Sequence, residues 1–151
     1  KYVLHHRDNT IDKWFLETLG VWVSTLNKCD YCVEHHFAGL KRLLNDDAKA
    51  NQIRSAIDTN NIENAPLENR QKTAMEYARK LTNNPGSIRE ENIEKLRADG
   101  FTDGEILEIN QVCAYFSYAN RTVLGLGCST KGDILGLSPN NNDDPNDWGH
   151  S

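Results

Sequence analysis

The stretch NKCDYCVEHH, residues 27–36, decides how this chain is interpreted. It contains two cysteines three positions apart, Cys29 and Cys32, and a histidine, His36, four positions after the second. An α-helix repeats every 3.6 residues, so positions i, i+3 and i+7 lie on one face. If a helix opens at Cys29, both thiols and the imidazole are expected to lie along a single stripe of it.

A carboxylate, Glu17, stands twelve positions before Cys29. Its neighbours in sequence include Phe15 and Leu19, which predicts that it is at least partly buried. A buried carboxylate without a partner is costly. His36, on a helix folded back against the first, would supply one directly or through a water. Two thiols, an imidazole and a carboxylate in one place are the components of a thiol redox centre with its own proton relay.

The expected roles of the two thiols follow from the chemistry of sulfur. The thiolate is the reactive species, and a free cysteine is mostly protonated at neutral pH. Unpaired N–H groups at a helix N-terminus favour an anion at Cys29, and His36 can take the proton of Cys32. A second thiol three positions away can resolve an oxidised first thiol into a disulfide, which protects the site from irreversible over-oxidation.

The same two cysteines also allow other interpretations. Cys-x2-Cys is half of a zinc site, and His35 and His36 could add ligands, together with Glu17. The remaining cysteines, Cys113 and Cys128, are far downstream and do not form a second half-site. A c-type haem requires a histidine directly after the second cysteine, where this chain has valine. A zinc site and a non-enzymatic redox-sensing or metal-binding module therefore stay open beside the catalytic interpretation.

The hydrophobic pattern predicts an all-α fold of about six helices. The helices are expected over residues 11–27, 29–45, 47–57, 66–83, 87–100 and 102–126. Pro66 suits the first turn of one of them, and Ser87–Glu90 and Thr102–Glu105 are predicted to be capping boxes. We expect residues 1–137 to form one helical domain and residues 138–151, mostly Asn, Asp and Pro, to form a polar tail.

Two parts of the sequence resemble a known family. The pattern Glu17-x11-Cys29-x2-Cys32-x3-His36 is similar to the site of AhpD-like proteins, within the carboxymuconolactone decarboxylase superfamily. The run NKCDYCVEHH resembles their peroxidase-related, or alkylhydroperoxidase, branch. The likeness continues in DGFTDGEILEINQVCAYFSYANRTVLGLG, residues 99–127. The resemblance implies an AhpD-like helical domain whose catalytic residues are those of the four-residue pattern.

The same resemblance implies a thiol-dependent peroxidase, an oxidoreductase of the peroxiredoxin type. Cys32 would attack the O–O bond of a hydroperoxide and become a sulfenic acid, and Cys29 would condense with it to a disulfide. Glu17 and His36 would move the protons, and a dithiol or protein thiol would restore the pair. No metal, haem or flavin cofactor is required. A carboxymuconolactone decarboxylase-type lactone enzyme is an alternative, although that reaction does not depend on a Cys-x2-Cys pair.

Composition limits the partners and the compartment. The 151 residues carry a formal charge of -5, without a Lys/Arg-rich patch, which argues against nucleic acid. No apolar run reaches the roughly 20 residues needed to span a bilayer, so no membrane partner is expected. Four cysteines are too few for a disulfide scaffold in a chain of this length. We therefore expect a reducing compartment, the cytoplasm.

The first predicted helix is apolar nearly all round, with Trp14, Phe15 and Trp22 among its large side chains. A surface helix of a monomer should show a polar side. We therefore expect a partner subunit to cover this helix in a homo-oligomer, a dimer, trimer or hexamer.

Other residues are expected to stay outside the chemistry. Asn120 falls on the apolar stripe of the last helix and is predicted to be a buried polar anchor. His35 points about 100° away from the relay histidine and is expected to lie outside the relay. Cys113 is predicted to be a core thiol. His5 and His6 are expected to form an exposed pair near the start of the chain.

Overall fold

The computed structural model describes residues 3–136, which form an all-α fold. Within these residues there are six α-helices and two short 3-10 helices and no strand, as predicted. The elements are α1 Lys13–Leu26, α2 Asp30–Leu44, α3 Asp47–Asp58, η1 Ile62–Asn64, α4 Asn69–Asn83, η2 Pro85–Ser87, α5 Glu90–Ala98 and α6 Asp103–Leu126. The tail predicted for residues 138–151 lies outside the described residues.

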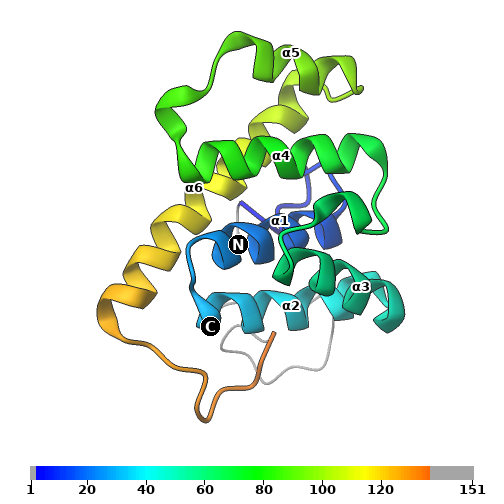
Figure 1. Ribbon diagram of the computed structural model, residues 1–151. Helices are drawn as coiled ribbons and strands as arrows, with labels where there is room; N and C mark the ends of the chain where they lie inside the picture. Colours follow the sequence, from blue (N-terminus) through cyan, green and yellow to red (C-terminus); the bar gives the residue numbers. More distant parts are fainter. Residues whose placement is uncertain (1–2, 137–151) are drawn as a thin grey trace.

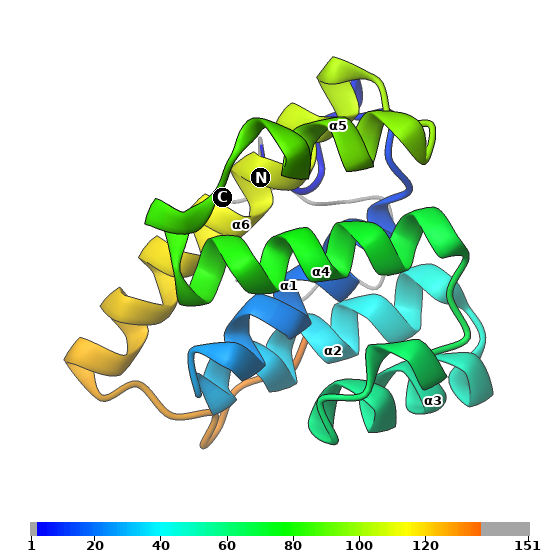
Figure 2. The same ribbon diagram turned by 45° about the horizontal axis from the view of Figure 1, so that its top comes forward.

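Helix α1 lies in the middle of the fold, with α2, α3, α4 and α6 packed around it (Figures 1 and 2). Every residue from Phe15 to Ser24 is buried within this one chain. A helix that is apolar all round belongs in an interior, and here the other helices provide that interior. The argument that α1 needs a partner subunit for cover is therefore wrong, whereas the oligomeric state stays a prediction.

Two contacts tie α1 to its neighbours. Trp22 is buried, and its Nε1 donates a hydrogen bond to the main-chain oxygen of Met75 on α4 at 2.9 Å. Phe116 of α6 packs directly over Gly20, where an added Cβ would lie 2.4 Å from the Cζ atom of the ring. Burying an aromatic side chain of this kind contributes roughly 1.5–3 kcal/mol. The missing side chain at Gly20 is what allows α6 to approach α1 so closely.

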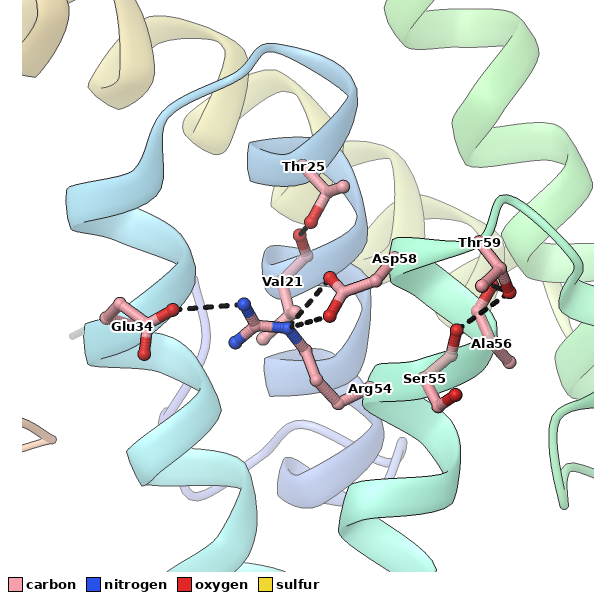
Figure 3. Close-up of polar contacts among 8 residues, drawn as sticks. All are labelled: Val21, Thr25, Glu34, Arg54, Ser55, Ala56, Asp58 and Thr59. Atoms are coloured by element: carbon pink, nitrogen blue, oxygen red, sulfur yellow. Dashed lines mark hydrogen bonds and ion pairs between the residues drawn. The ribbon is translucent and has the colours of Figure 1, made fainter.

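Arg54 fastens α3 to α2, and Figure 3 shows its guanidinium between Glu34 and Asp58. Its Nη2 donates to Glu34 Oε1 at 3.0 Å, and its Nε donates to Asp58 Oδ1 at 2.8 Å. On α1, in the same view, Thr25 Oγ1 donates to the main-chain oxygen of Val21 at 2.9 Å. Partly exposed ion pairs contribute about 0.2–1 kcal/mol each, so Arg54 orients α3 more than it stabilises the fold.

Capping residues decide where α4 and α6 begin. The predicted box at α6 is confirmed, because Glu105 N donates to Thr102 Oγ1 at 3.2 Å and Thr102 N donates to Glu105 Oε2 at 2.8 Å. Helix α4, in contrast, does not begin at Pro66. Its N-cap is Glu68, whose N–H donates to Gln71 Oε1 at 2.9 Å. A side chain that satisfies a free N–H group fixes the helix start more firmly than the preference of proline for a first turn.

The predicted start of α5 is also wrong. Ser87 belongs to the 3-10 turn η2, and its hydroxyl donates to the main-chain oxygen of Asn84 at 2.7 Å. The N-cap is Arg89 instead, and its N–H donates to Asn92 Oδ1 at 2.9 Å. The serine hydroxyl is engaged in the turn before the helix and is not available as a cap.

The segment before α1 is held against α6. Glu108 of α6 accepts hydrogen bonds from Thr10 N at 2.9 Å, from Thr10 Oγ1 at 3.1 Å and from Ile11 N at 3.0 Å. The side chains of Leu4 and Ile11 are buried in the core. This segment is therefore part of the folded body.

The segment after α6 returns along α2, as the orange part of Figure 1 shows. The chain leaves α6 at Gly127, whose φ of 68° is in the left-handed region that favours glycine. Asp133 then pairs with His35 of α2 at 3.2 Å, and Arg42 donates a hydrogen bond to the main-chain oxygen of Gly136. None of the helices within residues 3–136 is long and apolar enough to cross a membrane.

Candidate active site

A tight corner between α1 and α2 places Cys29 at the N-cap of α2. Lys28 turns the chain with a φ of 58°, and the Cys29 N–H donates to the main-chain oxygen of Ser24 at 2.9 Å. Cys29 thus stands just outside the helix, and Cys32 lies in its first turn. Among the described contacts no side chain caps this helix start, so its free N–H groups keep the partial positive charge that favours an anion.

The sulfur atoms of Cys29 and Cys32 lie 2.8 Å apart, and both cysteines are free thiols. Cys29 is 0% exposed and Cys32 is 5% exposed. A disulfide bond is about 2.05 Å long. A small movement of the side chains is therefore enough to bring the sulfurs to bonding distance.

Cys32 lies in a site that keeps its thiol protonated. Burial raises the pKa of Cys32 to about 12, and the neighbouring Cys29 adds to the rise, whereas a side-chain hydrogen bond with Asn120 lowers it. Asn120 is fully buried, accepts a hydrogen bond from Asn27 Nδ2 at 2.9 Å and donates one to Ser24 Oγ at 3.0 Å. The prediction of a buried polar anchor is confirmed. The contact of Asn120 with the Cys32 thiol was not predicted, and it makes Asn120 part of the candidate site.

Glu17 of α1 lies between two imidazoles. Its Oε2 is 2.6 Å from Nδ1 of His36 and its Oε1 is 2.9 Å from Nε2 of His5, while its side chain is 2% exposed. Burial by itself raises the pKa of Glu17, but the charges and hydrogen bonds of His36 and His5 outweigh it and lower the pKa to about 2. Glu17 is therefore ionised at neutral pH. The predicted burial of this carboxylate and its pairing with His36 are both confirmed.

Two small residues make room for this pair. A Cβ atom added at Gly39 of α2 would lie 3.3 Å from the carboxyl carbon of Glu17. The ring of Phe116, which occupies the space above Gly20, meets the ring of His36 edge-on, with centroids 4.5 Å apart and planes at 85°. The imidazole is thus held by an aromatic contact on its ring and by a carboxylate at Nδ1, which favours a proton on Nδ1 and a lone pair on Nε2.

The expectation of an exposed histidine pair near the start of the chain is wrong for His5. Its side chain is 8% exposed, whereas that of His6 is 37% exposed. His5 reaches Glu17 because the segment before α1 folds back over the helices. The only hint in the sequence was the apolar pair Val3 and Leu4 directly before it, since apolar residues are often buried.

Tyr115 of α6 is a second residue that the sequence did not single out. Its side chain is 39% exposed. Burial raises the pKa of its phenol, and electrostatic interactions with Cys32 and Glu17 raise it further. Tyr115 is therefore a partly exposed residue that interacts electrostatically with both groups.

His35 and Tyr31, on the first turns of α2, lie apart from Glu17. The His35 ring is 4.5 Å from the Tyr31 ring and its Nε2 is 3.2 Å from Asp133 Oδ2. Burial raises the pKa of Tyr31, and its hydrogen bond with Asp133 raises it further. Asp133 therefore accounts for the position of His35, which makes no described contact with Glu17 or with the two thiols.

The other two cysteines differ in environment. Cys113 is 1% exposed, and burial raises its pKa to about 12, which agrees with a core thiol. Cys128 is exposed, and it is one of the groups that raise the pKa of Cys32. Within residues 3–136, no three His, Cys, Asp or Glu side chains are grouped so that they could hold a metal ion.

Comparison with solved structures gives the class of protein. An uncharacterized peroxidase-related protein from Silicibacter sp. TM1040 is 30% identical over 85% of this chain, with a TM-score of 0.76. The alkylhydroperoxidase AhpD core of an uncharacterized peroxidase-related protein from Ralstonia eutropha JMP134 is 26% identical over 93% of this chain, with a TM-score of 0.73. This chain spans 64% and 66% of the lengths of these two chains. No protein-family model and no curated protein matches it.

The all-α fold and these structural neighbours confirm the likeness to the AhpD-like superfamily that the sequence pattern predicted. Both of these structures are described as peroxidase-related. The predicted resemblance of this chain to peroxidase-related AhpD-like proteins is thereby confirmed.

Proposed function

We propose that this protein is a thiol-dependent peroxidase, an oxidoreductase that reduces hydroperoxides with Cys29 and Cys32 and moves protons through Glu17 and His36. One arrangement carries the proposal: two free, buried thiols whose sulfurs are 2.8 Å apart, on helices that also hold a buried carboxylate bonded to an imidazole. A thiol pair at this separation can be oxidised and reduced reversibly, and the carboxylate–imidazole pair can hold the proton that is released.

The first sulfur to meet a peroxide is Cys32, because it is the more exposed of the two, at 5% against 0% for Cys29. Its pKa of about 12 means that the resting thiol keeps its proton, so the attack requires a base. His36 is the base: its Nδ1 is bound to Glu17, which leaves the lone pair on Nε2, and the charge of Glu17 stabilises the imidazolium that forms. The proton passes directly or through a water.

The reaction then balances as follows. The Cys32 thiolate attacks one oxygen of ROOH, an S–O bond forms as the O–O bond breaks, and the sulfur is oxidised to a sulfenic acid. The leaving RO⁻ takes the proton from His36 and departs as the alcohol. Cys29 attacks the sulfenic sulfur, an S–S bond forms, and the hydroxyl group leaves as water with the proton of Cys29. An external dithiol is oxidised in turn and restores both thiols.

Peptide mass spectrometry after addition of one equivalent of cumene hydroperoxide to the reduced protein tests the proposal. The peptide that spans Cys29 and Cys32 should lose two hydrogens, and a dithiol should restore them. Cys32→Ser should abolish turnover, and Cys29→Ser should stop at a Cys32 sulfenic acid. Glu17→Gln and His36→Ala should slow turnover by roughly 10²–10⁴-fold. Cys113→Ala, which removes a thiol from the core on α6, is the matched control and should keep turnover.

The proposal fails if Cys29 and Cys32 stay reduced while Cys113 is oxidised. Stoichiometric zinc in the native protein that is lost on Cys32→Ser would also contradict it, because thiolates coordinated to zinc are not a free redox pair.

A further inference from the structure

The proposed relay of Glu17 and His36 uses only one oxygen of the carboxylate. The other oxygen, Oε1, is 2.9 Å from Nε2 of His5. His5 lies outside the helices, in the segment before α1, and its side chain is 8% exposed. Burial removes water from both the imidazole and the carboxylate, and this loss costs free energy. The contact between the two groups offsets that cost, so it calls for a structural explanation.

The segment that carries His5 is fixed on both sides of it. Leu4, directly before it, is 3% exposed, and Ile11 is 7% exposed. Glu108 of α6 accepts three hydrogen bonds from Thr10 and Ile11, at 2.9 to 3.1 Å. The position of His5 is therefore set by core packing and by a carboxylate clamp on α6.

Groups on three elements interact with Glu17. His36 on α2 and His5 in the segment before α1 contact its carboxylate, and the charge of Glu17 helps to raise the pKa of Tyr115 on α6. Against the opposing effect of burial, His36 and His5 together lower the pKa of Glu17 to about 2. Each imidazole thus contributes to keeping the carboxylate ionised.

The charged groups on the same segment as His5 are more exposed. Arg7 and Asp8 lie 3.6 Å apart with side chains 90% and 73% exposed, and Asp8 is also 3.5 Å from the His6 ring. In water, charges of this kind act weakly on a buried site. The contact of His5 with Glu17, in contrast, joins two side chains that are 8% and 2% exposed.

We propose that His5 is a positioning residue of the relay: it holds Oε1 of Glu17, so that the carboxylate stays in place with Oε2 directed at Nδ1 of His36. The last torsion of a glutamate side chain has a broad energy profile, so a carboxylate anchored at one oxygen can rotate. A carboxylate that is anchored at both oxygens cannot rotate, and it then also fixes the tautomer of His36. The catalytic consequence rests on the proposed peroxidase function, whereas the effect on Glu17 does not.

Three variants test this inference. His5→Ala removes the donor, His5→Gln supplies an amide N–H in its place, and His6→Ala is the matched control, an imidazole on the same segment that contacts Asp8. The first readout is the pH titration of the Glu17 carboxyl carbon by NMR. His5→Ala should raise the pKa of Glu17 by about one unit, His5→Gln should raise it less, and His6→Ala should leave it unchanged.

The second readout is the pair of kinetic constants for cumene hydroperoxide reduction at neutral pH. His5→Ala should lower kcat roughly tenfold, as loss of a partner that orients a reacting group does, and His5→Gln, which restores a donor, should recover most of the loss. KM should stay the same, because His5 acts through Glu17 and does not touch the substrate.

A Glu17 titration in His5→Ala that matches the wild type would overturn the inference. So would a fall in kcat that His5→Gln does not reverse, because that pattern indicates only a looser fold. If His5→Ala does not fold, His5→Gln still decides the question: it keeps a donor but lacks the charge of the imidazole, so a smaller rise in the pKa of Glu17 must appear, and a titration equal to the wild type would overturn the inference. A wild-type protein without peroxide turnover would refute the proposed function alone, and the Glu17 titration would still decide the role of His5.

Discussion

Replacing Glu17 with glutamine should lower the free energy of unfolding by about 3 kcal/mol at pH 6 and by almost nothing near pH 2. The pKa of this carboxyl falls from 4.5 to about 2 on folding, and one pKa unit corresponds to about 1.4 kcal/mol. The amide resembles the protonated carboxyl in shape and in charge. The difference between the two proteins therefore measures what ionisation of Glu17 contributes to the fold.

The direction of the pH effect follows from the lowered pKa. A carboxyl whose pKa is lower in the folded state stabilises that state fully above its unfolded pKa of 4.5, and this stabilisation is lost as the pH falls toward about 2. By pH 3 the wild type should already have lost about 2 kcal/mol of its advantage over Glu17→Gln.

Urea denaturation of both proteins at several pH values between 6 and 3, followed by tryptophan fluorescence, measures this difference. The other carboxylates titrate in both proteins, so their effects cancel in the comparison. Glu63→Gln is the control, because Glu63 is exposed, and its difference from the wild type should stay near zero. A difference for Glu17→Gln that is the same at pH 6 and at pH 3 would refute the reasoning, since it would show that the charge of Glu17 does not stabilise the fold.

Three further predictions concern the surroundings of the site. Gly20→Ala should destabilise the protein by about 1–3 kcal/mol, because its Cβ would lie 2.4 Å from the ring of Phe116; an unchanged urea midpoint would show that the ring can move aside. Asn120→Ala should slow alkylation of Cys32 by iodoacetamide at pH 8, because it removes the hydrogen bond that lowers the pKa of this thiol. Peptide mass spectrometry gives the rate, and equal rates would contradict the assignment. Glu108→Ala removes the acceptor of three hydrogen bonds that hold the segment before α1, so it should raise the pKa of Glu17 as His5→Ala does. NMR titration of the Glu17 carboxyl carbon measures this pKa, and an unchanged value would mean that core packing alone holds the segment.

The sequence was sufficient to predict the two helices, α1 and α2, that carry the candidate site. The apolar spacing in α1 and α2, with a corner at Lys28, predicts two helices folded back on each other. That arrangement places Glu17 opposite His36, as the structure confirms. Helical periodicity is a local property, so contacts between adjacent helices joined by a short corner can be derived from it.

Contacts that depend on the path of irregular segments could not be derived in this way. His5 lies before the first helix, where no periodicity indicates direction, and core packing together with the clamp by Glu108 brings it to the site. The hydrogen bond between Asn120 and Cys32 needs the register of α6 against α2, which side-chain packing sets. The start of α5 was missed because the hydroxyl of Ser87 is engaged in a turn, and a serine serves turns and caps equally well.

The corner at Cys29 also bears on how the redox state can be communicated. The Cys29 N–H is bound to the main-chain oxygen of Ser24, and the Cys29 main-chain oxygen accepts from the N–H of Val33, so a bond between the two sulfurs would require none of these main-chain bonds to break. The domain could then store and release a pair of electrons as a rigid body, without a shape change that travels along its helices. Any protein that distinguishes the dithiol from the disulfide state would have to contact the sulfurs themselves.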